Sequence, residues 1–160
     1  MSNTAERYTL AAQSPNMRVN PDRPTSMDYL IAAGLTRGGP GLVFMRVRSE
    51  FDKSCGKVSM SSLESAFRIL NSELRYITNE PPARIAQTVL AWWLDPSCPP
   101  CGSSGVVKST EYPMGKVCLR CRGTRFKKLP YGGVGRALVA FIESSMAESS
   151  DQINRVLHRR

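Results

Sequence analysis

The sequence predicts a mainly α-helical fold with one short, cysteine-rich β-hairpin inserted between two of its helices. Two observations carry this prediction. Apolar residues recur at three- and four-residue steps over 61–78, over 82–94 and again after residue 131, which is the period of helices that bury one face. Four of the five cysteines, by contrast, lie between residues 98 and 121, in a segment rich in glycine and basic residues. Such a composition is typical of tight turns.

The first of these helices has the clearest start. The hydroxyl of Ser61 is expected to accept a hydrogen bond from the backbone of Glu64, whose carboxylate accepts one from the backbone of Ser61. The helix is expected to continue to about Thr78, where the sequence Asn-Glu-Pro-Pro ends it. Its apolar stripe consists of Leu63, Ala66, Phe67, Leu70, Leu74 and Ile77.

The helix over 82–94 follows after a short connection, so the two helices are expected to pack as neighbours. Trp92 and Trp93 continue its apolar stripe of Ile85 and Val89. We therefore expect both tryptophans in the core or at an interface.

A third helical pattern starts near Tyr131, with an inward-facing set of Val134, Leu138, Phe141 and Ile142. Glycines at 132, 133 and 135 weaken its first turn. A separate, short C-terminal helix is expected from Ser150, with an apolar set of Ile153, Val156 and Leu157.

Residues 1–50 are expected to form an irregular, flexible arm outside the core, because prolines at 15, 21, 24 and 40 and the Gly-Gly-Pro-Gly loop at 38–41 interrupt them. The exception is one or two helical turns after Ser26, ending at Gly34. The apolar run 42–45 is too short for its periodicity to distinguish a strand from a helix.

A length of 160 residues predicts one ordinary domain with extensions. We expect the arm at 1–50 and a helical domain at 51–160 that contains the cysteine-rich segment at 97–125. No apolar run approaches the roughly 18 residues of a membrane span, and the first residues lack the apolar core of a secretory signal. A soluble protein of the cytosol is therefore expected, without a membrane partner.

The cysteines form two C-x-x-C pairs separated by 16 residues, a spacing typical of a four-cysteine zinc site. Gly102 and Gly123 follow the two pairs and provide the positive φ angles that such turns need. Four thiolates fill the coordination shell of zinc, so the ion is expected to be structural. The expected ligands of this one Zn²⁺ ion are Cys98, Cys101, Cys118 and Cys121.

The rival interpretations are a thioredoxin-type redox pair and two disulfides. Both are disfavoured, because a redox motif needs one C-x-x-C at a strand-to-helix junction and cytosolic thiols stay reduced. Cys55, the fifth cysteine, is expected to be a small buried residue, and His158, the only histidine, an exposed one. Without a Ser-His-Asp arrangement or a phosphate loop, we expect no enzyme.

The charge is concentrated near the cysteines. The chain carries 22 Lys and Arg against 13 Asp and Glu, and between residues 98 and 136 eight cations face the single anion Glu111. A polyanion that releases counterions on binding is a favourable partner for such a segment. The alternatives are a solvated basic face and, less favoured, an acidic membrane surface.

The order of helix, C-x-x-C-G-x-x-G, basic hairpin, C-x-x-C-x-G, Leu-Pro and helix resembles the zinc-containing region of the late-gene antitermination proteins of lambda-like phages, the lambda Q family. Residues 87–91, 98–105, 118–124 and 129–139 carry the resemblance, which covers about residues 52 to 145. The cysteine motif alone is shared with the chaperone cysteine-rich repeat, but the flanking helices favour the phage family.

The resemblance implies a helix-turn-helix in which the zinc ribbon is an insertion. The helix over 82–94 would be the supporting helix of this motif. The helix from Tyr131 would enter the major groove with its first turn. The DNA-contacting residues implied are Arg120, Arg122, Arg125, Lys127, Lys128, Tyr131, Gly132 and Arg136.

Proteins of that family bind a DNA element at a late promoter, engage a paused RNA polymerase with its sigma factor, and make it read through terminators. The resemblance therefore implies double-stranded DNA and the bacterial RNA polymerase holoenzyme, at its beta flap and sigma factor, as partners, with nascent RNA as a further candidate, in the cytoplasm of a bacterial host. Two alternatives stay open: a zinc-ribbon protein that binds RNA or RNA polymerase without base readout, and a co-chaperone-like module that binds unfolded polypeptide.

Overall fold

A computed structural model describes residues 7–8, 10–11, 25–36, 38–53, 56–108 and 113–158. Within these ranges the chain is mainly helical and carries one small antiparallel hairpin, which confirms the predicted fold class. The elements are α2 (Ser26–Leu35), α3 (Pro40–Lys53), α4 (Met60–Ile77), α5 (Pro82–Leu94), the 3-10 turn η1 (Pro99–Cys101), β1 (Val106–Val107), β2 (Lys116–Val117) and α6 (Gly132–Leu157). None of the helices in these ranges is long and apolar enough to cross a membrane.

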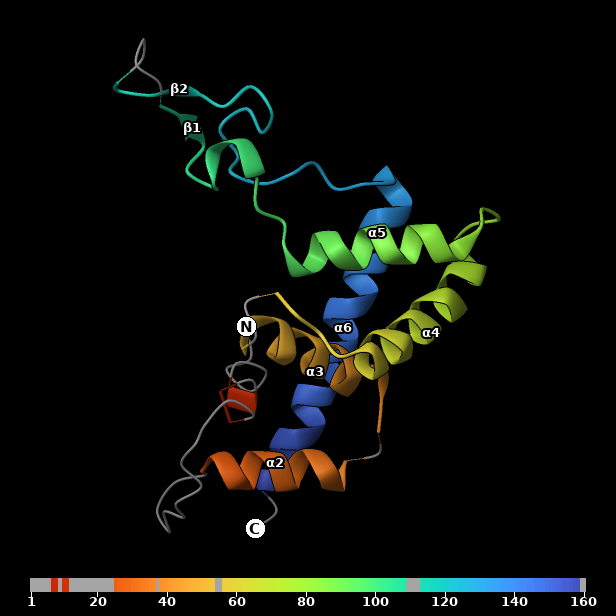
Figure 1. The fold of residues 1–160 in the computed structure, drawn as a ribbon. Coiled ribbons are helices and arrows are strands. Elements are labelled where there is room, and N and C mark those ends of the chain that lie inside the picture. Colours follow the sequence, from red (N-terminus) through yellow and green to blue (C-terminus); the bar gives the residue numbers. More distant parts are fainter. Residues whose placement is uncertain are drawn as a thin grey trace.

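Helix α6 is the axis around which the other helices pack (Figure 1). Helix α5 crosses it near its N-terminal end, α3 packs against its middle, and α2 lies near its C-terminal end. The hairpin projects from the α5 end of the molecule. The main core is formed by Phe44 and Val47 of α3, Ala66, Leu70 and Leu74 of α4, Ile85, Ala86, Val89, Leu90 and Leu94 of α5, and Leu138 and Ile142 of α6.

The irregular structure expected over residues 38–50 is wrong for α3, which begins at Pro40. Pro40 occupies the start of α3, where a missing N–H costs nothing. Gly41 lets α3 approach α6 closely, since a Cβ there would lie 2.0 Å from the backbone oxygen of Ser145. Phe44 is fully buried. Gly38 and Gly39 lie outside a helix, as expected for a loop, whereas Pro40 and Gly41 belong to α3. The boundary expected after residue 50 falls inside α3.

The helix predicted after Ser26 is confirmed and ends at Leu35, one residue beyond Gly34. It packs against the C-terminal half of α6 in a second, smaller cluster. The separate C-terminal helix expected from Ser150 is wrong, because α6 continues unbroken through it. The Ser150 hydroxyl donates to the Met146 carbonyl one turn earlier at 2.8 Å, so it is satisfied inside the helix and caps nothing.

The helix start expected at Ser61 is also wrong. Ser59 is the N-cap of α4 and accepts from the backbone of Ser62. The acid at this helix start is Glu50 of α3, whose carboxylate accepts from the Ser59 backbone and the Ser62 hydroxyl, each at 2.8 Å. Partial burial raises the pKa of Glu50, but these hydrogen bonds and the charge of Arg46 outweigh it and hold the pKa below its usual value. A tertiary contact has replaced the local capping box.

Candidate metal centre and basic face

The four cysteines of the two C-x-x-C pairs lie together, as predicted. Their sulfur atoms are all within 4.8 Å of one another, with 3.9 Å between Cys98 and Cys118 and 3.7 Å between Cys101 and Cys121. A tetrahedron with metal–sulfur bonds of about 2.3 Å has edges of about 3.8 Å. The cluster therefore has the dimensions of a tetrahedral four-thiolate site, and it can hold a metal ion.

Two tight turns aim the cysteines at a common point. The first is η1, after which Gly102 adopts a left-handed conformation with φ 52°. The second closes with a 2.7 Å hydrogen bond from the Arg122 backbone to the Cys118 carbonyl, and is followed by Gly123 with φ 81°. The positive φ angles predicted for both glycines are confirmed.

The short hairpin joins the two turns. Val106 pairs with Val117, and Val107 with Lys116. One step further, the Cys118 backbone donates to the Gly105 carbonyl at 2.9 Å. The hairpin register thus fixes the distance between the first and second cysteine pairs.

Burial of the cluster affects the protonation of its thiols. Burial, together with hydrogen bonds that the neutral Cys98 thiol makes with the side chains of Cys101, Cys118 and Cys121, raises the pKa of Cys98 to about 12. The neutral thiol is therefore strongly favoured when no positive charge is near. A bound metal ion would reverse this preference, because it binds the thiolate and releases the proton.

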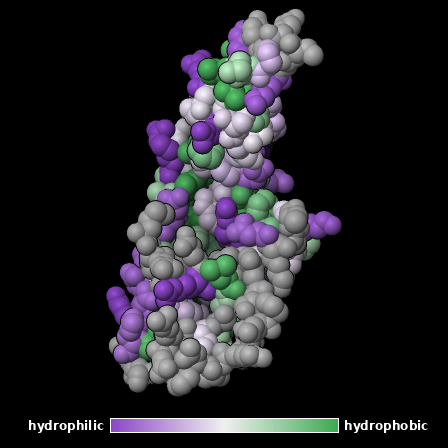
Figure 2. Space-filling model, turned by 90° about the vertical axis from the view of Figure 1, so that its left-hand side faces the viewer, coloured by the Kyte–Doolittle hydropathy of each residue, from purple (hydrophilic) through white to green (hydrophobic). Residues whose placement is uncertain are grey.

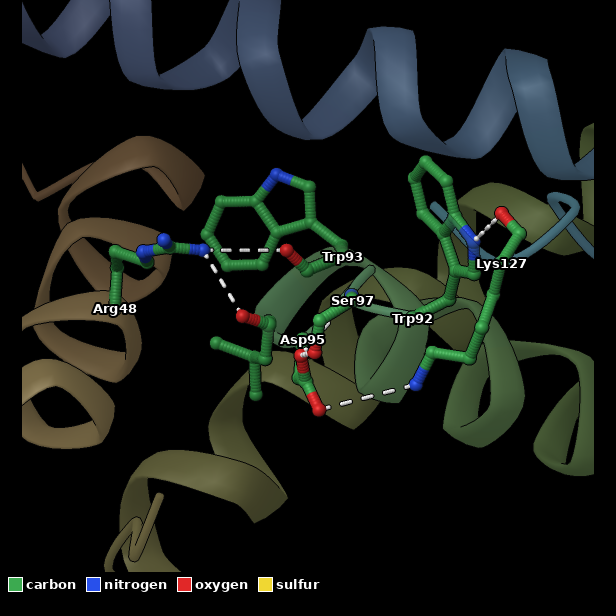
Figure 3. Close-up of polar contacts among 7 residues, drawn as sticks. Arg48, Trp92, Trp93, Asp95, Ser97 and Lys127 are labelled. Atoms are coloured by element: carbon green, nitrogen blue, oxygen red, sulfur yellow. Dashed lines mark hydrogen bonds and ion pairs between the residues drawn. The ribbon is translucent and has the colours of Figure 1, made fainter. Parts of the chain in front are cut away.

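We call residues 97–126, which contain the four cysteines, the ribbon. Its base is hydrogen-bonded to α5 (Figure 3). The Trp92 indole Nε1 donates to the Lys127 carbonyl at 2.9 Å, and the Lys127 backbone donates to the Pro96 carbonyl at 2.8 Å. The entering and leaving chains also pair between Ser97 and Phe126. The ribbon is therefore attached to the helical core by two chain segments, which pair at one isolated bridge, and by the Trp92 indole.

Asp95 ends α5 and connects this base to the basic residues. Its carboxylate accepts from both the hydroxyl and the backbone of Ser97 and lies 3.9 Å from the Lys127 ammonium (Figure 3). The Ser97 hydroxyl, then its backbone N–H, and the Lys127 charge together lower the pKa of Asp95 against a small opposing effect of burial. The carboxylate thus remains charged at the ribbon base.

Arg48 of α3 holds the other side of the α5 terminus. Its guanidinium donates to the carbonyls of Trp93 and Leu94, each at 3.2 Å, and lies 5.7 Å from the centre of the Trp93 ring (Figure 3). A cation at the negative end of a helix is stabilising. The interface role predicted for the tryptophans is thus confirmed: Trp93 packs on the core and Trp92 on the ribbon base. The cap by Arg48 has no signal in the local sequence.

No protein-family model matches this chain, and no curated protein matches it either.

Most of the predicted DNA-contacting residues are exposed. These are Arg120, Arg122, Arg125, Lys128, Tyr131, Gly132 and Arg136. Lys127 is half-buried, because its backbone forms the ribbon base. Arg122 and Arg125 in the ribbon and Tyr131 directly before α6 have positive φ angles, so the backbone turns sharply at each of them.

The structure brings only three of these cations to one pocket. Arg120, Lys127 and Lys128 line a hollow of about 390 Å³ together with Thr88, Ala91 and Trp92 of α5 and Pro130. Sequence reasoning missed the α5 contribution. The sequence feature that could have indicated it is the spacing of residues 88, 91 and 92, which places the three residues on one face of a helix.

The start of α6 depends on a close backbone approach. A Cβ on the buried Gly135 would lie 2.0 Å from the Pro130 carbonyl oxygen, whereas one on the exposed Gly133 would meet only the end of the Arg136 side chain at 3.9 Å. Gly135 therefore sets how the segment before α6 folds back onto the helix. Glycine lowers the helix propensity of this first turn, but at position 135 it is required by the close approach of Pro130.

Proposed function

We propose that this protein binds double-stranded DNA and acts as a phage transcription antitermination factor, organised by one structural Zn²⁺ ion. The observation that carries the proposal is the ribbon geometry: four clustered cysteines fix a strongly basic module between two packed helices, α5 and α6. The resemblance to the lambda Q family supports the same reading.

Zinc is the ion that fits the donor set. Four cysteine thiolates in a tetrahedron are typical of Zn²⁺ in a structural site, and they leave no open position for water. The residues that would hold it are Cys98, Cys101, Cys118 and Cys121. The bound ion would fix the ribbon, and we propose no catalytic role for it.

On DNA, α5 would be the supporting helix of a helix-turn-helix. The first turns of α6 would enter the major groove. Gly132 and Gly133 are exposed and lack side chains, so the backbone can approach closely there. Arg136 is exposed on the same turns and is the candidate for base readout. Lys127, Lys128 and the ribbon arginines would contact phosphates. In the bacterial cytoplasm, the partner enzyme would be the RNA polymerase holoenzyme, through its beta flap and sigma factor.

In vitro transcription tests the antitermination activity. Templates carrying the late promoter of the protein's own phage and an intrinsic terminator are transcribed by bacterial RNA polymerase holoenzyme with and without the protein. The expected result is read-through that depends on the promoter-proximal DNA element. Termination that is unchanged by the protein would remove the antitermination proposal.

One observation favours a second candidate, a ribbon that binds RNA or RNA polymerase without base readout. Figure 2 shows hydrophobic and hydrophilic side chains interleaved at the ribbon end of the molecule. Val117, Leu119 and Met114 are exposed there beside Lys116 and Arg120. Apolar side chains are of little use to a phosphate backbone and suit a protein surface. The same mixture argues against a co-chaperone, which needs a broad apolar groove.

A further inference from the structure

The pocket between α5 and the segment leading to α6 has a lining that phosphate binding alone does not explain. Arg120, Lys127 and Lys128 contribute three positive charges to the lining. Trp92 and Pro130 contribute apolar surface. Among the described residues that line the pocket, none is acidic. A ligand that matches both kinds of lining carries an anionic group joined to a flat or apolar one.

The cations of this pocket are available. Within the described part of the chain, Arg120 and Lys128 are exposed and have no ion-pair partner. Lys127 has only its long contact with Asp95, in which both side chains are partly exposed. An exposed pair of this kind is worth little, so an incoming phosphate can compete for the ammonium.

The aromatic ring in the pocket lining is held by a hydrogen bond. The Trp92 indole is held by its hydrogen bond to the Lys127 carbonyl, so the ring and the lysine are positioned together. The volume of about 390 Å³ lies at the lower end of the range of small-ligand sites, about 300 to 1,000 Å³. The pocket is therefore the right size for one nucleotide and too small for a duplex.

We propose that this pocket binds one nucleotide of a nucleic-acid backbone, with its phosphate against Arg120, Lys127 and Lys128 and its sugar or base against Trp92 and Pro130. The proposal rests on the proposed nucleic-acid binding and adds a specific contact outside the α6 helix. The nucleotide can belong to a duplex or to a single strand, and the experiment separates the two.

The test introduces a negative charge into the pocket and leaves its three cations and Trp92 in place. Thr88 is exposed at the pocket wall, and its hydroxyl bonds only to the Arg84 carbonyl of its own helix. In Thr88→Glu the carboxylate would occupy the phosphate position. Gln87→Glu makes the same change of charge one residue earlier, where the side chain lines a different pocket, against Phe67 and Leu90. Thr88→Gln controls for size.

Binding is measured by fluorescence anisotropy with a short labelled duplex and a short labelled oligothymidine. We expect Thr88→Glu to weaken binding roughly tenfold, and Gln87→Glu less than about twofold, because an exposed charge outside the site is screened. Thr88→Gln should bind like the wild type. The arm that shows the loss, duplex or single strand, identifies the source of the nucleotide. Thermal unfolding and zinc content confirm that the variants are folded.

A second measurement reports on Trp92 directly. In Trp93→Phe, Trp92 is the one remaining tryptophan, since the chain has two. Its emission should change when the bound nucleic acid saturates the protein, and the change should be lost when Thr88→Glu is added. Unchanged emission at saturation overturns the proposal, as does equal weakening by Thr88→Glu and Gln87→Glu.

Two other outcomes separate this inference from the proposed function. Wild-type protein that binds neither oligonucleotide overturns both. Displacement of the oligonucleotide from wild-type protein by polyglutamate at the same charge concentration overturns the nucleotide site alone, because it shows that any polyanion satisfies the cations.

Discussion

The indole Nε1 of Trp92 donates a hydrogen bond to the carbonyl oxygen of Lys127, 35 residues further along the chain and on the far side of the ribbon. This one bond joins the end of α5 to the segment that leads into α6. It ties the position of the basic residues to the helical core rather than to the ribbon alone.

Trp92→Phe should therefore loosen the ribbon base. Phenylalanine keeps most of the ring contact and loses the donor, so we expect about 1 kcal/mol less stability, the usual worth of a neutral hydrogen bond. Hydrogen exchange should become faster in residues 125–128. Tyr76→Phe, on a side chain that is 85% exposed, is the control and should change neither quantity.

The α3–α6 crossing provides a test of packing. Gly41→Ala would place a Cβ 2.0 Å from the Ser145 backbone oxygen, so one of the helices must move. We expect a loss of about 3 kcal/mol or more in chemical denaturation. Gly38→Ala, which has nothing within 4 Å of the added carbon, should be nearly neutral. Equal effects at the two positions would contradict the close crossing.

A matched pair of glycines tests the start of α6. Gly135→Ala meets the Pro130 carbonyl and should displace the segment before the helix, which weakens both stability and DNA binding. Gly133→Ala has room for its methyl group and should raise stability by up to about 1 kcal/mol through helix propensity. Thermal unfolding and DNA titration measure the two effects.

Glu50 predicts a dependence on pH. Its pKa is lowered in the folded protein from the ordinary value of 4.5, so its hydrogen bonds at the α4 start stabilise the fold above that value. This contribution should be lost as the pH falls below 4.5 and through the lowered pKa. Glu50→Gln should lower the free energy of unfolding at neutral pH. In acid, the difference in this free energy between the variant and the wild type should become smaller. A gap that stays constant across this window would exclude the role of Glu50.

Metal removal should affect the two parts of the molecule differently. The cysteine cluster is separate from the main core, which is built by α3, α4, α5 and α6. With a strong chelator, or in Cys118→Ser, we expect rapid hydrogen exchange across residues 97–126 and a largely unchanged helical circular dichroism signal. Cys55→Ser should keep its full metal content. Cys55 itself lies outside the described residues, and its expected burial stays a prediction.

Base readout is tested at the α6 start. Arg136→Ala should reduce discrimination among DNA sites by about 1 to 3 kcal/mol at one base pair. Lys128→Ala should instead weaken all sites alike and reduce the salt slope by about one. If Arg136→Ala keeps full discrimination, α6 is not the recognition helix.

Sequence reasoning succeeded where a local pattern determines the structure. The stripe from Leu63 to Ile77 and the two C-x-x-C pairs depend on spacing alone, and both appear in the structure as expected. It failed where a distant partner decides the outcome. Gly41 is a loop signal in isolation and a helix-crossing residue beside Ser145, and the acid at the α4 start comes from Glu50 rather than from Glu64.

The candidate site shows the same division. The cysteines and the basic residues are evident from composition, but their grouping is a property of the fold. Arg120 lines one pocket with Lys128 and Thr88, although these residues come from three separate segments of the chain. The cap by Arg48 spans more than forty residues and has no local signature.

The unbroken course of α6 has a mechanical consequence. At 1.5 Å per residue, its 26 residues form a rod about 39 Å long, with the basic ribbon at one end and α2 at the other. A rigid helix moves as one body. A nucleic acid that reorients the first turn of α6 therefore also reorients the surface around α2. Contacts made at opposite poles of the protein are thus geometrically coupled without a hinge between them.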